Sequence, residues 1–165
     1  MKQTSFILLI IILLTLSSCG IYSLSGAKID AKTIQVNYFP NNANLVEPTI
    51  SQKFTIALQN IFLQQSSLNL VKTDGELQFE GEIIDYIIRP TAASAQQTAD
   101  MNRLTIKVKV RFYNKLNEDD NFEQTFSHFY DYEANQQLSS VKDDAFDTIF
   151  ERITQDIFNA SVAKW

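Results

Sequence analysis

The chain has 165 residues, with 14 lysines and arginines against 19 aspartates and glutamates. This acidic balance argues against general affinity for nucleic acid, which needs clustered positive charge. One histidine and one cysteine exclude a histidine-rich metal site and a disulfide framework, and the four glycines form no phosphate-cradling loop. The length and the 12 phenylalanines suit one domain with a sizeable core.

The N-terminus has the pattern of a bacterial lipoprotein signal peptide. Lys2 precedes an apolar run from Phe6 to Leu14, which is shorter than the roughly 20 residues of a membrane-spanning helix. The run leads into Leu-Ser-Ser-Cys at 16–19, which resembles the lipobox, whose cysteine becomes the lipidated N-terminus. We therefore predict that residues 1–18 are removed and that Cys19 is the lipid attachment site. An ordinary signal peptide with a free thiol, or a short membrane anchor, is the alternative.

The residues after Cys19 indicate where the lipoprotein is held. Cleavage leaves 13 basic and 19 acidic residues, a net charge of −6, because Lys2 is the only charged residue removed. Gly20 follows the cysteine in place of the aspartate that tends to retain lipoproteins at the inner membrane, so the outer membrane is favoured. No acidic cluster follows, which favours the periplasmic face. We expect a lipidated tether over 19–30 and a single domain over 31–165.

The first half of the domain alternates between strand and helix patterns. Apolar residues alternate over 33–39, which predicts a half-buried strand. Pro48 can open the amphipathic helix that helical spacing predicts over 49–66. A second strand begins at 68–71 and resumes over 76–89, with Thr73-Asp74-Gly75 as a turn or bulge within it. Pro90 ends this strand.

The second half of the domain predicts two strands and a helix. Residues 101–113 form the clearest predicted strand, because 103–112 alternate between basic or polar side chains and apolar ones, and 122–133 form a further strand. The final helix is predicted to begin near Ser140, with Asp143 as its capping partner. The order β-α-β-β-β-α predicts an α+β two-layer sandwich, with two helices on one face of a four-stranded sheet.

One surface has a chemical bias. Arg103, Lys107, Lys109 and Arg111 project from the same side of one predicted strand. Such a row could bind the phosphates or carboxylates of an anionic ligand. The alternative, which the sequence favours, is pairing with acids of the preceding strand, because opposite charges across neighbouring strands stabilise a sheet. The acids that this strand presents are Glu76, Glu80 and Glu82.

No catalytic constellation emerges from the residue types. His128 lies in a strand and is expected to be a packed or surface histidine. Nucleophilic catalysis would need a base beside a serine or cysteine, and the sole cysteine is assigned to lipid. Carboxylates are plentiful, and a periplasmic enzyme that uses two of them is not excluded by counting alone.

The whole mature sequence resembles the LptE family of lipopolysaccharide-assembly lipoproteins, in its Bacteroidetes-type branch. The stretches that carry the resemblance are "CGIYSLSGAKI", "IQVNYFPNNANLVEPTISQKFTIAL", "GELQFEGEIIDY", "ADMNRLTIKVKVRFYN" and "DIFNASVAKW". Together they run from Cys19 to Trp165. The "NRLTIKVKV" strand and the "IFNASVAKW" ending, in this order and spacing, are the specific ones.

The resemblance implies a non-enzymatic outer-membrane lipoprotein without a cofactor. Members of this family are anchored through their lipid and sit inside the large β-barrel LptD as plug and assembly partner in lipopolysaccharide transport. By the same resemblance, lipopolysaccharide is the ligand for which Arg103, Lys107, Lys109 and Arg111 are candidates. A periplasmic glycolipid carrier that acts without a barrel partner is the alternative.

Overall fold

The computed structural model describes residues 30–91 and 100–162. The elements in chain order are β1 (Thr33–Val36), α2 (Ile50–Gln65), β2 (Asn69–Leu70), β3 (Leu77–Thr91), β4 (Met101–Asn114), the short 3-10 helix η1 (Glu118–Asp120), β5 (Phe122–Glu133) and α3 (Leu138–Ser161). The predicted signal peptide, Cys19 and all of the tether except its last residue lie outside the described residues.

The sheet has five strands in the order β2-β1-β3-β4-β5, so the prediction of four strands is wrong. The segment expected to form one interrupted strand forms two, β2 and β3, which lie on opposite sides of β1. Both run parallel to β1, whereas β3, β4 and β5 pair antiparallel. The α+β class and the two helices of the prediction are confirmed.

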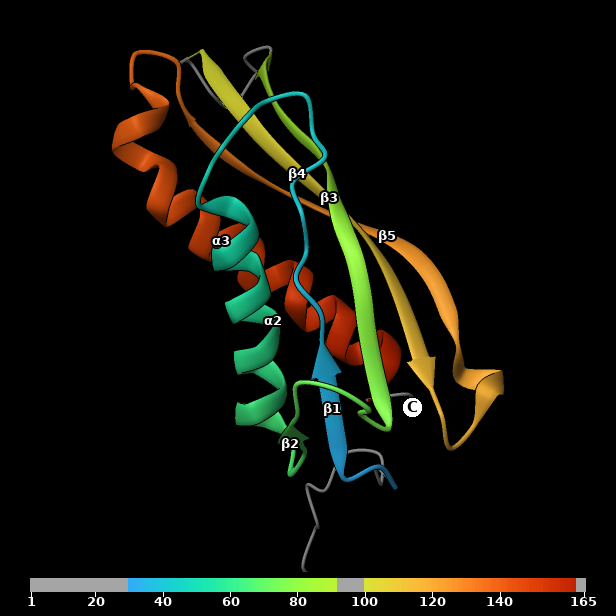
Figure 1. The fold of residues 1–165 in the computed structure, drawn as a ribbon. Coiled ribbons are helices and arrows are strands. Elements are labelled where there is room, and N and C mark those ends of the chain that lie inside the picture. The colour runs from blue at the N-terminus through green and yellow to red at the C-terminus, as the bar shows by residue number, and fades with distance from the viewer. Residues whose placement is uncertain (1–29, 92–99, 163–165) are drawn as a thin grey trace, which may run out of the picture.

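The connection between β2 and β3 explains why one predicted strand becomes two. At its centre Asp74 has a φ of 61°, and a Cβ on Gly75 would lie 2.7 Å from the backbone nitrogen of Gln35. The chain therefore crosses close to β1 here (Figure 1). Glu76 then accepts hydrogen bonds from the backbone N–H groups of Lys32 and Thr33, at 2.5 and 3.2 Å, and these lower the pKa of its carboxyl. Glu76 thus binds the start of β1 and not the basic row.

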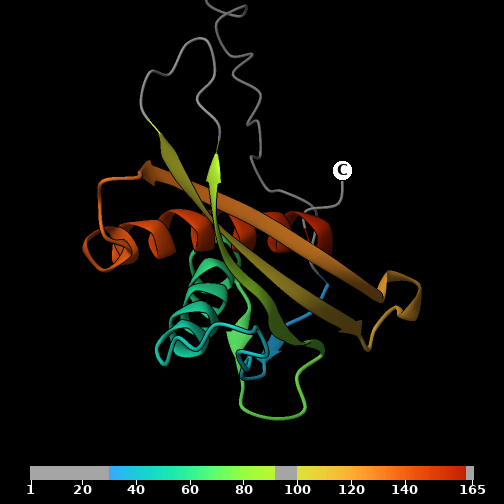
Figure 2. The ribbon, with the colours of Figure 1, turned by 90° about the horizontal axis from the view of Figure 1, so that it is seen from above.

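The two helices pack on the same face of the sheet (Figures 1 and 2). Their shared core contains a chain of aromatic contacts: the Phe79 ring lies 4.8 Å from the Phe62 ring of α2 and 4.8 Å from the Phe112 ring of β4. Phe62 also contacts Phe158 of α3 at 5.3 Å. As the alternation of β4 predicts, its inward side chains are fully buried: Leu104, Ile106, Val108, Val110 and Phe112. The opposite face of the sheet, which we call the open face, carries no helix among the described residues.

A register shift in β3 accounts for a stretch that is apolar on both sides. Ile83 pairs with Val108 and Asp85 with Lys107, so one extra residue, Ile84, is accommodated between them. After this bulge Tyr86 takes an inward position and is buried. Burial, with a contribution from Glu47, raises the pKa of Tyr86 to about 12.

Candidate functional site

The basic row lies on the open face of β4, as its alternation predicts. Arg103, Lys107, Lys109 and Arg111 have half-buried side chains that are 31–42% exposed. Successive side chains of a strand point to opposite faces. Because the residues that alternate with the four bases are fully buried in the core, the bases must point to the open face.

Each of the four bases is paired with a carboxylate on a neighbouring strand. On β5, Asp131 binds Arg103 and Glu123 binds Lys109, both at 2.7 Å. On β3, Asp85 lies 2.8 Å from Lys107. Arg111 faces two further β3 carboxylates at longer range, those of Glu80 at 3.8 Å and Glu82 at 3.9 Å. Four bases thus face five acids, and the row is not a stripe of uncompensated positive charge.

Arg103 has the most elaborate surroundings in the row. Its Nε and Nη2 donate to the two carboxylate oxygens of Asp131 at 2.7 Å each, which raises the pKa of the arginine. The guanidinium also lies over the ring of Phe129, 3.6 Å from the ring centre. Arg89 of β3 stands directly opposite Arg103 in the register and is exposed. This corner therefore has two arginines for one aspartate. Of the positions along the basic row, it is the one where the negative charge of an anion would be repelled least. Sequence reasoning missed Arg89, which could have been found as a base just before Pro90.

His128 lies on the inward face of β5 and not in a catalytic arrangement. Its Nε2 is 2.7 Å from a carboxylate oxygen of Asp156 on α3. The contact joins helix to strand at the margin of the core, in agreement with the expectation of a packed or surface histidine. Within residues 30–91 and 100–162, no group of three or more histidine, cysteine, aspartate or glutamate side chains could hold a metal ion.

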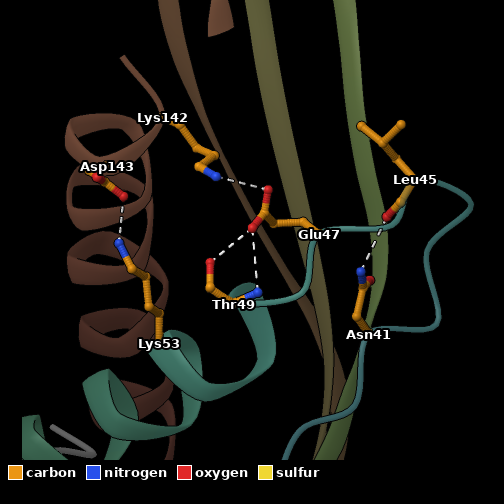
Figure 3. A network of polar contacts seen from close by, with 7 residues as sticks. All are labelled: Asn41, Leu45, Glu47, Thr49, Lys53, Lys142 and Asp143. Atoms are coloured by element: carbon orange, nitrogen blue, oxygen red, sulfur yellow. Dashed lines mark hydrogen bonds and ion pairs between the residues drawn. The ribbon is translucent and has the colours of Figure 1, made fainter. Parts of the chain in front are cut away.

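Figure 3 shows a second polar network, which fixes the connection between β1 and α2. Glu47 accepts hydrogen bonds from the hydroxyl of Thr49 at 2.9 Å and from Lys142 of α3 at 3.1 Å. Partial burial would raise the pKa of Glu47, but these hydrogen bonds outweigh it and lower the pKa below its usual value. Lys53 of α2 binds Asp143 at 2.6 Å, so Asp143 joins the two helices (Figure 3). The predicted capping role of Asp143 is wrong, because α3 begins earlier, at Leu138, and has no side-chain cap.

A groove with a volume of about 460 Å³ lies between the two helices. Apolar side chains such as Ile56, Ala57 and Phe150 line it together with Lys53 and Glu151, so its character is mixed. None of the helices in the described part of the chain is long and apolar enough to cross a membrane.

The fold and the charge-paired open face together define a small two-layer α+β domain. Solved structures share this fold at very low identity. A protein from Xanthomonas campestris matches with a TM-score of 0.54 and 6% identity over 84% of this chain and 87% of its own. A hypothetical protein from Chlamydia trachomatis matches at 0.52 and 8%, over 81% and 99%. A minor lipoprotein from Acinetobacter baumannii matches at 0.51 and 11%, over 78% and 91%.

The family is shown by a match between this sequence and the model of a protein family. The model described as LptE, lipopolysaccharide-assembly, matches residues 31–161, which is most of the chain. The chain therefore belongs to the LptE family of lipopolysaccharide-assembly proteins. No curated protein matches the sequence.

Proposed function

We propose that this protein is an outer-membrane lipoprotein, anchored through Cys19, that partners and plugs the LptD β-barrel in lipopolysaccharide transport. The observation that carries the proposal is the family match, which extends over the whole folded domain from 31 to 161. The N-terminal sequence supports the anchor, because its apolar run is followed by Leu-Ser-Ser and the only cysteine. Several acyl chains on one residue would hold the protein stably at a membrane, whereas a single chain gives only marginal binding.

The physical character of the domain suits a plug. Its core is held by side-chain packing without disulfides, and the four bases of the basic row are matched by carboxylates of the neighbouring strands. A surface with matched charges can lie against the polar interior of a barrel at little electrostatic cost. A domain of this size can bury well over about 1,000 Å² against such a partner, as specific interfaces do.

The test is a mild-detergent pull-down of the full-length, lipidated protein, followed by mass spectrometry of what accompanies it. We expect a stoichiometric outer-membrane barrel of the LptD type. A Cys19→Ser variant, which cannot be lipidated, should leave the membrane fraction. Recovery of the protein alone, or with bound lipid only, would end the plug proposal and favour the glycolipid carrier that acts without a barrel.

We propose separately that the basic row contacts lipopolysaccharide, with Arg103 as its main contributor. The support is the corner at which Arg89 and Arg103 outnumber Asp131, next to the exposed ring of Phe129. Phosphate and an apolar chain could be bound side by side there. An Arg89→Gln, Arg103→Gln variant should weaken lipopolysaccharide binding more than a Lys107→Gln, Lys109→Gln variant. Equal binding by both variants and the parent would mean that the row serves only to pair strands.

A further inference from the structure

The two edges of the sheet differ sharply in length. One edge is β2, which has two residues, and the other is β5, which has 12. A long edge strand presents a row of unpaired backbone N–H and C=O groups, to which another chain can add. The short edge is therefore protected by its size, and the long edge needs some other protection.

The register identifies the free backbone groups of β5. Ala134 donates its backbone N–H to the carbonyl of Asp100 at 2.9 Å, and this pair continues the β4–β5 register. In an antiparallel ladder every second residue bonds the neighbouring strand, so the even-numbered residues of β5 face β4. The odd-numbered residues point their N–H and C=O groups away from the sheet. Five of them are Glu123, Thr125, Ser127, Phe129 and Asp131, and the sixth, Glu133, ends the strand and accepts a hydrogen bond from the backbone N–H of Gln136.

This edge has no covering partner in the part of the chain that the structure describes. No loop, helix or side chain there donates to or accepts from the backbone of the five odd-numbered residues. Natural edge strands are usually protected by charged side chains, lysine above all, by proline or by a bulge. The register of β5 is continuous from Phe122 to Glu133, and positions 116–141 contain no proline, lysine or arginine. The same positions contain six acids: Glu118, Asp119, Asp120, Glu123, Asp131 and Glu133.

We propose that β5 accepts an extended, basic segment of a partner polypeptide as a sixth, antiparallel strand of the sheet. Backbone hydrogen bonds to the odd-numbered residues would supply affinity, and the side chains beside them would supply selectivity. Those side chains lie on the open face, with Glu123 and Asp131 eight positions apart. On the β4 side, Glu123 binds Lys109 and Asp131 binds Arg103. The incoming strand would place a second base, Lys or Arg, on the free side of each carboxylate and an apolar side chain opposite Phe129, which is 42% exposed.

The acidic edge disfavours a second copy of this chain as the occupant. A symmetric antiparallel pair of β5 strands centred on Ser127 would place Glu123 opposite Asp131 twice. Like charges directly opposite one another destabilise a strand pair. A partner with the complementary charge has no such penalty. The inference goes beyond the LptD partnership proposed above and does not rest on it.

The first test uses a fluorescent nine-residue peptide with lysine at both ends, valine opposite Phe129 and threonine elsewhere. Its anisotropy is titrated with the full-length protein in detergent. We expect binding, and weaker binding of the same peptide with glutamate at both ends. Ser127→Pro removes one free N–H without breaking a bond to β4, so it should weaken binding about tenfold or more. Ser127→Ala, the matched control, should bind like the parent. The Glu123→Lys variant should prefer a peptide with glutamate in place of the facing lysine.

The second test is residue-resolved amide hydrogen exchange, which still decides if the proline variant fails to fold. In the free protein, the amides of Thr125, Ser127 and Phe129 should exchange fast, and those of Phe126 and His128 slowly. The lysine peptide should slow the three fast amides selectively. Equal protection of both sets without peptide would show that another segment of this chain already occupies the edge, and protection that rises with protein concentration would show a second copy. Either result, or peptide binding that Ser127→Pro leaves unchanged, overturns the proposal.

Discussion

Gly81 provides a strict test of how β3 and β4 are packed, because the substitution Gly81→Ala adds one methyl group at their contact. The new Cβ would lie 2.1 Å from the carbonyl oxygen of Lys109 and 2.5 Å from the ring of Phe39. A carbon and a carbonyl oxygen approach one another only to about 3.3 Å in ordinary sheet contacts. The strands would therefore have to separate locally by about 1 Å.

The size of the effect follows from what can move. A buried aromatic ring and a backbone carbonyl both obstruct the methyl group, and the carbonyl belongs to a strand that is paired on both sides. Overpacking of a core costs typically about 1–3 kcal/mol, and more when backbone must shift. We expect Gly81→Ala to lower the free energy of unfolding by about 3 kcal/mol. At a position without a clash, the same change would stabilise by about 0.4–1 kcal/mol through the unfolded chain.

The assay is urea unfolding of the mature chain with Cys19→Ser, which avoids lipid. The midpoint should fall while the slope with denaturant stays constant, because the surface exposed on unfolding is unchanged. Phe39→Leu removes the ring contact, so in a Phe39→Leu background Gly81→Ala should still lower stability, but by less than in the parent. Unchanged or increased stability of Gly81→Ala would refute the reasoning. If Gly81→Ala costs nothing in the Phe39→Leu background, the carbonyl contact does not matter.

Three further predictions concern the core and its pH dependence. Phe79→Ala should lower stability by about 3–5 kcal/mol, because a fully buried ring with two aromatic neighbours is lost; unfolding with Phe79→Leu as the milder comparison checks this. Since the folded state lowers the pKa of Glu47 below 4.5, its stabilising effect is present above that pH and is lost as the pH falls through the folded pKa. Glu47→Gln should therefore make unfolding less sensitive to acid, whereas equal acid sensitivity in both proteins would contradict the role of Lys142. Burial raises the pKa of Tyr86 to about 12, so stability should fall as the pH rises above 10, and Tyr86→Phe should reduce that fall in an alkaline unfolding series.

The sequence predicted correctly those elements whose apolar residues recur with one clear spacing, that of a strand or that of a helix. The strict alternation of β4 allowed both its buried side and its basic side to be assigned. The helix predicted over 49–66 is confirmed as α2, with a difference of one residue at each end. The prediction is close because the apolar residues recur there with regular helical spacing. The family resemblance was also predicted from sequence stretches, and the family model confirms it.

The remaining features depend on contacts between distant positions. A turn at Thr73-Asp74-Gly75 is visible in the sequence, but nothing local tells that the chain crosses β1 there and resumes on its other side. The partners of the basic row were predicted only from the preceding strand. Two of them, Glu123 and Asp131, come from β5, and their identity requires a register that local patterns do not contain. The apolar run around Ile84 was ambiguous because a bulge changes the side that each residue faces.

The parallel pairing of β1 with the start of β3 places the beginning of the domain at one end of the long β3 strand. Val36 lies beside Phe79, whereas the far end of β3 is 12 residues further on at Thr91, about 40 Å away at the rise of a strand. The chain thus enters the fold at one end, and the β3–β4 hairpin ends at the other. With the lipid anchor proposed at Cys19, the ends of β3 and β4 at Thr91 and Met101 would lie at the end of the domain opposite to the one where the anchored chain enters the fold. A longer tether before β1 would then let the whole domain lie further from the membrane, whereas a shorter pair of β3 and β4 strands would change only the far end of the domain.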